Sequence, residues 1–186
     1  RAMRSLGISS TTHVVAYDDA GGTVAARLWW LLRACGHERV SLLDGGIGAW
    51  SAEGRPTTTE VPDVAPADFT ARFDPSHVRS LDEVRAHVQS GGVLLDARAR
   101  ERYRGDTERV DPRPGHIPGA RSAPTSEALQ DGRFRSVDEL RARFGPLVDG
   151  ASSVVASCGS GVTACHTIFA LELAGLVPFD AARLYV

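Results

Sequence analysis

Apolar residues occur first as two short runs separated by a segment with helical spacing. His13–Tyr17 and Val40–Leu43 are typical of short buried strands. Between them, Thr23–Cys35 places its leucines on one side of a helix, and Gly36 follows where a C-cap glycine is expected. Because strands and helices alternate and the strands are continuously apolar, we expect a parallel sheet with helices on both faces.

The same alternation returns in the second half of the chain. Gly92–Asp96 and Val154–Ser157 are predicted strands, and Thr163–Ala174 is a predicted helix. Ser80–Glu83 and Ser136–Glu139 both match the capping box, in which a serine and a glutamate satisfy each other's end of a helix start. We therefore expect a second α/β unit.

Periodicity is lost between these two units. Glu53–Pro75 carries several prolines, threonines and acidic residues, so we interpret it as part of a linker. The expected division is a first unit over residues 1–54, a linker over 55–75 and a second unit over 76–186. A long loop is expected over Ala97–Ser122, which is rich in arginine.

The two units contain an internal repeat. Val14–Thr23 can be aligned with Val154–Thr163 at a constant offset of 140, and five of the ten positions are identical. Both segments have the pattern strand, glycine-bearing turn and helix start. At the turn, Asp18 occupies the position of Cys158, so only one copy carries a thiol.

Composition narrows the possible functions. The chain has 186 residues, 42% hydrophobic and 24% charged, as in soluble globular proteins. A net charge of −2 argues against nucleic-acid or membrane-surface partners, and all 21 basic residues are arginine, which excludes lysine chemistry. Three cysteines without C-x-x-C spacing indicate a reducing cytoplasm, neither a disulfide framework nor a metal site; they are Cys35, Cys158 and Cys165.

Cys158 is the candidate nucleophile. It follows a predicted strand and begins a turn of small residues, Cys158–Thr163, that leads into a helix. Ligands of parallel α/β sheets bind at the carboxyl ends of strands, and backbone N–H groups at a helix start stabilise an anion. A thiolate placed there is a nucleophile; the alternative is an inert, packed cysteine.

Several motifs in one order resemble the tandem rhodanese-domain sulfurtransferases. The second unit carries Asp96–Arg98, Arg102–Gly105, Gly115–Ala120 and Cys158–Ala164 in the family's order. In the first unit, Asp18–Gly22 and Leu43–Trp50 resemble the family's inactive domain. The resemblance implies a rhodanese-like α/β fold, with the tail half of an inactive domain followed by a catalytic domain truncated at its C-terminus, so we expect a fragment.

The resemblance also implies a mechanism without a cofactor or metal. The Cys158 thiolate takes a sulfur from a small-molecule donor, becomes a persulfide and passes the sulfur to a thiol acceptor such as thioredoxin, or to cyanide. Ser160 would join a proton relay at the leaving group. Backbone groups of the loop would bind the substrate; they belong to Gly159, Gly161, Val162 and Thr163.

The loop after Cys158 and the nearby arginines predict which sulfur donor is preferred. Relatives with Cys-Gly-Ser-Gly-Val-Thr favour 3-mercaptopyruvate, whereas thiosulfate-preferring members carry arginine and lysine after the cysteine. Arginines clamp carboxylates well because the guanidinium fork is bidentate. Arg102 matches the family's first position, and the second is Arg113 or Arg109, of which we favour Arg113.

Other functions remain open or are disfavoured. A thiosulfate sulfurtransferase and a non-catalytic sulfur-carrier or binding module are both alternatives. A phosphatase of the Cys-x5-Arg type is disfavoured because the sixth residue after Cys158 is Ala164. His116 is expected to be a structural turn residue.

Overall fold

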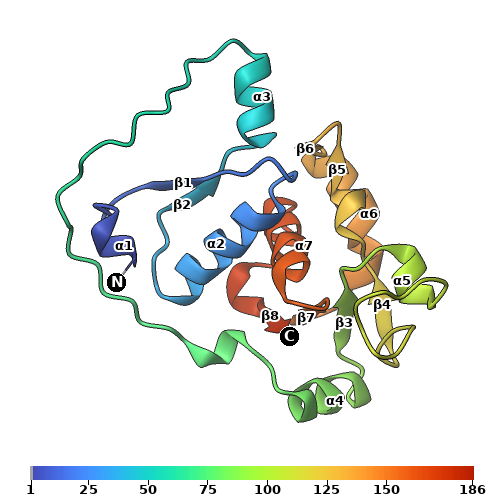
Figure 1. The fold of residues 1–186 in the computed structure, drawn as a ribbon. Helices are drawn as coiled ribbons and strands as arrows, with labels where there is room; N and C mark the ends of the chain where they lie inside the picture. Colours follow the sequence, from blue (N-terminus) through green and yellow to red (C-terminus); the bar gives the residue numbers. More distant parts are fainter. Residues whose placement is uncertain (1) are drawn as a thin grey trace. The chain divides into compact units, whose positions relative to one another are not determined.

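The computed structural model describes residues 2–186 and divides into two units. The first extends to Pro75 and the second covers Ser76–Val186 (Figure 1). Each unit has its own strands and its own buried residues, so each is described by itself. Among the described residues, no helix combines the length and apolar character needed to cross a membrane.

The first unit is a two-stranded parallel sheet with helices. Its strands pair in the register Val14↔Val40, and the buried face of the long helix brings Trp29, Trp30 and Leu32 into the core. The elements are α1 (Ala2–Ser5), β1 (Val14–Ala16), α2 (Thr23–Ala34), β2 (Val40–Leu42) and α3 (Gly46–Ala52).

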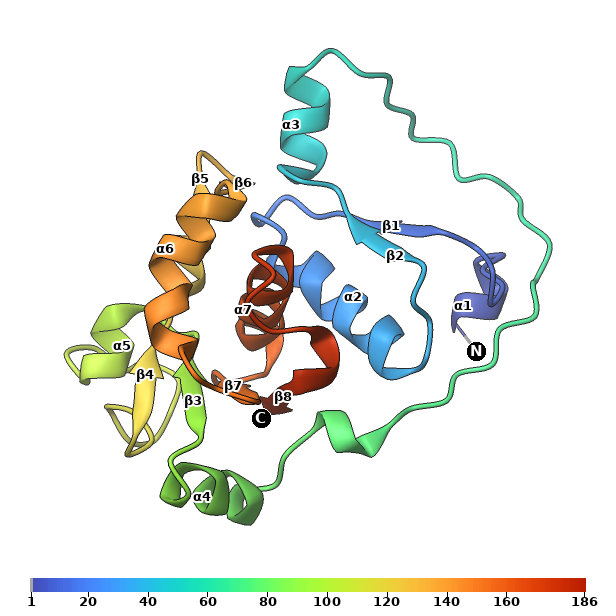
Figure 2. The same ribbon diagram turned by 180° about the vertical axis from the view of Figure 1, so that it is seen from behind.

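The second unit is built on a four-stranded parallel sheet of order β4-β3-β7-β8. Figures 1 and 2 show α6 and α7 beside these strands from both sides. The elements are η1 (Pro75–His77, at the unit boundary), α4 (Leu81–Gln89), β3 (Val93–Asp96), α5 (Arg100–Arg104), β4 (Ala120–Ser122), η2 (Thr125–Ala128), β5 (Leu129–Gln130), β6 (Arg133–Phe134), α6 (Val137–Val148), β7 (Val154–Ser157), α7 (Val162–Leu173), η3 (Phe179–Ala181) and β8 (Ala182–Tyr185).

Both faces of this sheet are covered, as the continuously apolar strands predicted. On one face, Leu94 and Val155 form a buried cluster with Val84 of α4, and Tyr103 of α5 packs against it. Helix α7 contacts β7 and β8, and α6 packs on α7. Strands buried on both faces are the reason that β3 and β7 lack an alternating pattern.

The helix starts are confirmed in detail, but part of the expected loop is ordered. Both capping boxes form: the Ser80 and Ser136 hydroxyls accept from the backbone N–H three residues later, and each glutamate side chain returns to the cap. The segment predicted as a loop over Ala97–Ser122 instead contains α5 and β4. Strand β8 was also not predicted.

The stretch between α3 and η1 contains neither helix nor strand among the described residues, and Figure 1 shows it as an extended trace. Its second half nevertheless bonds to the first unit. The N–H groups of Ala67 and Arg72 donate to the carbonyls of Arg4 and Cys35, and Phe69 is buried against His37. Part of the expected linker is thus packed on the first unit.

The internal repeat is present in three dimensions, with a one-residue difference at the turn. The strands β1 and β7 begin at the predicted offset of 140, but α2 and α7 begin at Thr23 and Val162, an offset of 139. Burial agrees with the second value, because Leu32 and Leu171 are both buried whereas Leu31 is exposed. The first copy therefore has one more residue between the start of the strand and the start of the helix.

Asp18 fills the turn of the first copy with its own carboxylate. It accepts from the backbone N–H groups of Ala20, Gly22, Val24 and Ala25 at 2.8–2.9 Å. Burial raises the pKa of Asp18, but these four donors together outweigh burial and leave the pKa below its usual value. The start of α2, where N–H groups could bind an anion, is therefore occupied by the Asp18 carboxylate.

Replacing Asp18 by asparagine is expected to destabilise the first unit by about 2 kcal/mol, because hydrogen bonds to a charged group each contribute more than neutral ones. Since the folded-state pKa is depressed, this contribution is complete above the ordinary carboxyl pKa of 3.8 and is lost as the pH falls through the lowered value. Urea unfolding at several pH values measures it. Asp19→Asn, at an exposed neighbour, is the control; equal effects of both substitutions contradict the prediction.

Candidate active site

Cys158 lies at the carboxyl end of the central strand β7 and just before α7. Its side chain is partly exposed, and the N–H of Gly161 donates to its Sγ over 3.0 Å. Gly161 adopts φ 75°, a left-handed conformation that glycine accepts readily, and this turn directs the N–H toward the sulfur. One backbone N–H group of the loop, that of Gly161, therefore contacts the sulfur.

A cavity of about 520 Å³ opens in front of the sulfur. Cys158 and Gly159 form one side, and the Gly115–Pro118 segment forms another. Tyr185 and Val186 also line it. The site therefore lies at the carboxyl end of the parallel strands, where ligands of α/β sheets bind.

Arg98 is the most deeply placed cation of this site. Its side chain is only 9% exposed, and it binds both carboxylate oxygens of Asp96, with 2.7 Å from Nη2 to Oδ2. Nη2 also donates to the carbonyl of Gly115 over 2.6 Å. The hydrogen bonds to Asp96 raise the pKa of Arg98 further above its usual value. Arg98 thereby ties the end of β3 to the loop that lines the cavity.

Arg102 belongs to the same network of charges. Its guanidinium binds Glu108 through two nitrogens, at 3.0 and 3.1 Å, and Nη2 lies 2.8 Å from Asp111 Oδ2. The hydrogen bond from Arg102, together with backbone N–H groups of Asp111 and Val110, lowers the pKa of Glu108 to about 2. Glu108 Oε1 accepts from three successive N–H groups, so it holds the loop around it.

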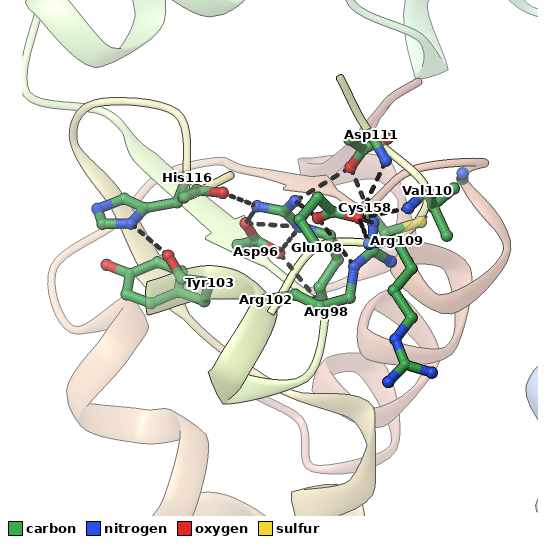
Figure 3. Close-up of polar contacts among 12 residues, drawn as sticks. Asp96, Arg98, Arg102, Tyr103, Glu108, Arg109, Val110, Asp111, His116 and Cys158 are labelled. Carbon is green, nitrogen blue, oxygen red and sulfur yellow. Dashed lines mark hydrogen bonds and ion pairs between the residues drawn. The ribbon is translucent and has the colours of Figure 1, made fainter. Parts of the chain in front are cut away.

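The three arginines predicted to bind the donor's carboxylate differ in their position relative to the cavity. Arg113 is exposed and lines the cavity. The guanidinium of Arg109 points away from the cluster in Figure 3. Arg102 does not line the cavity among the described residues, because Asp111 lies on its cavity side. Their roles in binding a donor stay predictions.

The remaining residues of the predicted loop lie at the start of α7. Ser160 is exposed one residue before Gly161, and Val162 and Thr163 form the first positions of the helix. Among described residues, none of these three lines the cavity. Cys165 and His166 are fully buried within α7, well inside the helix, whereas Cys158 is at its exposed start.

His116 lines the cavity and is also fixed structurally. Its ring stacks on Tyr103 with centroids 3.8 Å apart, and Nδ1 is 2.8 Å from the Tyr103 carbonyl oxygen (Figure 3). These contacts agree with the interpretation of His116 as a turn residue.

Three charged residues that line the cavity were not predicted from the sequence as site residues: Asp96, Arg98 and Asp111. Arg98 belongs to the Asp96–Arg98 motif and lies two residues after the end of a predicted strand. That position indicates a site residue and could have identified Arg98. Asp111 lies among arginines in a segment expected to be loop, where no local pattern indicates which ion pairs form.

The chain belongs to the rhodanese-like domain family, whose family model matches residues 2–53 and 80–185. It is 45% identical over 188 residues to a probable 3-mercaptopyruvate sulfurtransferase of Pseudomonas aeruginosa. This match covers 98% of this chain and 65% of the relative. It is 41% identical over 183 residues to a thiosulfate sulfurtransferase of Cricetulus griseus, covering 92% of this chain and 60% of the relative.

The solved structures agree with this assignment. The crystal structure of SseA from Escherichia coli, described as a 3-mercaptopyruvate sulfotransferase with the rhodanese fold, superimposes with a TM-score of 0.84 at 32% identity. The match covers 99% of this chain and 69% of that chain. The predicted rhodanese-like α/β fold is confirmed, and the chain spans less than two thirds of the length of the curated relatives named above.

Proposed function

We propose that the protein to which this chain belongs is a sulfurtransferase that moves sulfur from 3-mercaptopyruvate to a thiol through a persulfide on Cys158. The observation that carries the proposal is the placement of Cys158. Its sulfur lies at a strand end, receives the N–H of Gly161 and faces a cavity lined by Arg98 and Arg113. Relatives named for both 3-mercaptopyruvate and thiosulfate support the reaction class.

In the first step, the Cys158 thiolate attacks the sulfur of 3-mercaptopyruvate. A sulfur–sulfur bond forms, the carbon–sulfur bond breaks, and its electron pair leaves on the enolate of pyruvate. The enolate takes up a proton to become pyruvate, and the enzyme holds a persulfide. Backbone N–H groups at the start of α7, beginning with Gly161, stabilise negative charge on sulfur. Ser160 is our candidate for the proton relay.

In the second step, a thiolate acceptor attacks the outer sulfur of the persulfide. The sulfur–sulfur bond to Cys158 breaks, its electron pair returns to the Cys158 thiolate, and the acceptor leaves as a persulfide. We propose a small thiol protein such as thioredoxin, or cyanide, as the acceptor, in the cytoplasm. The three free thiols, Cys35, Cys158 and Cys165, support a reducing compartment, and the acidic net charge disfavours nucleic-acid and membrane partners.

Intact-protein mass spectrometry tests the reaction. The chain is incubated with 3-mercaptopyruvate or with thiosulfate, and gain of one sulfur atom is followed. A persulfide on Cys158 from 3-mercaptopyruvate supports the proposal, and reaction only with thiosulfate supports the alternative donor. No adduct from either donor, with the full-length relative of Pseudomonas aeruginosa reacting in parallel, excludes catalysis by this chain.

The loop sequence should control the choice of donor. Replacing Gly159 by arginine and Ser160 by lysine adds cations for the dianion thiosulfate, so we expect the rate ratio of thiosulfate to 3-mercaptopyruvate to rise about tenfold. A Cβ at Gly159 would contact only Asp111 Oδ1, at 3.8 Å, so the backbone tolerates the change. Persulfide formation with each donor measures the ratio, and an unchanged ratio refutes this account of the loop.

A further inference from the structure

Asp111 binds the guanidinium groups of Arg98 and Arg102 with one carboxylate oxygen. Its Oδ2 lies 3.1 Å from Arg98 Nη1 and 2.8 Å from Arg102 Nη2. Of these three residues, Asp111 and Arg98 line the cavity with Cys158, whereas Arg102 does not. The other side of the carboxylate faces the Cys158 loop, since Oδ1 is 3.8 Å from the place of a Cβ on Gly159. A carboxylate thus occupies the space between the arginines and the nucleophile's loop (Figure 3).

Most of the other donors of the two arginines are bonded to other groups. Arg98 uses Nε and Nη2 on Asp96 and on a backbone carbonyl, and Arg102 uses Nε on Glu108. The nitrogens that point to Asp111 are Arg98 Nη1 and Arg102 Nη2, each of which also approaches Glu108. One carboxylate oxygen at the position of Asp111 Oδ2 therefore meets two guanidinium donors at once.

The loop does not depend on the Asp111 carboxylate for its shape. Glu108 Oε1 accepts the N–H groups of Arg109, Val110 and Asp111 at 2.8–3.0 Å. This carboxylate fixes the backbone at Asp111, whose side chain is one-third exposed. The Asp111 side chain can therefore leave the arginines for solvent while the loop stays in place.

From these contacts we infer that Asp111 is an internal competitor for the donor's carboxylate, which binds to Arg98 and Arg102 by displacing it. The inference rests on the proposed function, and it names the residue that sets donor affinity and charge selectivity. Exchange of one monocarboxylate for another leaves the charge of the cluster unchanged. Thiosulfate would add a second negative charge beside Asp96 and Glu108, so the exchange favours a monoanionic keto acid.

Pyruvate is the probe, because it carries the keto-acid group without transferable sulfur. Isothermal titration of the 186-residue chain measures its dissociation constant in wild type, Asp111→Asn and Asp106→Asn. Removing the competitor makes the arginines permanently available, so Asp111→Asn should bind pyruvate about tenfold more tightly. Asp106 carries the same charge on the same loop but pairs with the exposed Arg104, so its substitution should leave binding unchanged.

A second substitution separates exchange from a general charge effect. Arg102→Met in the Asp111→Asn background should cancel the gain, because the released nitrogen is then absent. Asp111→Ser serves as the replacement if the asparagine variant does not fold. In turnover with 3-mercaptopyruvate, KM should fall while kcat is unchanged, a split that a purely structural role of Asp111 does not produce.

The outcomes of the two proposals are distinguishable. The inference is overturned if folded Asp111→Asn binds pyruvate no more tightly than wild type does. It is also overturned if neither wild type nor Asp111→Asn binds pyruvate. Tighter binding by Asp106→Asn to the same degree also overturns it, because charge alone then explains the gain. If wild type binds pyruvate but takes no sulfur from 3-mercaptopyruvate, the proposed function is wrong. The inference about Asp111 is then decided by the titration alone, through the comparison of wild type with Asp111→Asn.

Discussion

Cys158→Ala is expected to lower sulfur transfer from 3-mercaptopyruvate by about 10⁴-fold or more, since removing a covalent nucleophile abolishes the pathway that depends on it. Among the described residues, no other cysteine lines the cavity, and Cys165 is fully buried. The same substitution should abolish the sulfur adduct that we expect mass spectrometry to detect in the wild type. Alanine changes little in folding here, as Cys158 is partly exposed.

Cys35→Ala is the matched control for this experiment. Cys35 is also partly exposed, and burial raises the pKa of its thiol, which makes it a poorer nucleophile at neutral pH. We expect full activity and an unchanged adduct in this variant. Retention of the adduct in Cys158→Ala, or its loss in Cys35→Ala, would show that the nucleophile has been assigned to the wrong residue.

Arg98→Met should destabilise the second unit by about 3–5 kcal/mol, the usual cost of removing one partner of a buried ion pair. Asp96 is 4% exposed and binds Arg98 through both oxygens, so methionine leaves its charge buried and without that partner. The carbonyl of Gly115 loses its donor as well. Chemical denaturation followed by circular dichroism measures the change in unfolding free energy.

Arg104→Met provides the comparison for surface charge. Arg104 binds Asp106 at 2.7 Å, but both side chains are more than half exposed. Exposed pairs contribute about 0–1 kcal/mol, so this variant should unfold close to wild type. If the two arginine variants lose similar free energy, burial is not what makes Arg98 important. Asp96→Asn in the Arg98→Met background should recover part of the loss, because the uncompensated charge is then gone.

Local patterns predicted the parts of the fold that depend on neighbouring residues. The capping boxes at Ser80 and Ser136 formed because a serine and a glutamate three residues apart need only each other. Strand β7 and the position of Cys158 after it followed from a short apolar run and a small-residue turn. The rhodanese-like fold was recognised from motifs in order, and the family match confirms it.

Elements that depend on distant partners were missed. Strands β4 and β8 form the edges of the sheet, and an arginine lies inside each of them, at Arg121 and Arg183. Such short, interrupted runs become strands because β3 and β7 offer hydrogen-bond partners, which no local pattern reveals. Helix α5 is five residues long, too short for a periodic signal.

The ion pairs of the site show the same limit. Arg102 was selected from a motif and Arg98 was not assigned a role, yet both bind Asp111 in the structure. Many arginines and carboxylates lie close together along residues 96–113, so the sequence allows many pairings. The fold selects among them by burying Arg98 against Asp96 and by curling the loop around Glu108.

The carboxylate of Asp18 also bears on how the two copies diverge. Its four hydrogen bonds from backbone N–H groups contribute to folding, and a cysteine at this position would give up that stability. A cysteine at position 18 would also lie one residue further from the helix start than Cys158 does. A thiol placed in the first copy as it is in the second would therefore require a deletion in the turn together with the substitution.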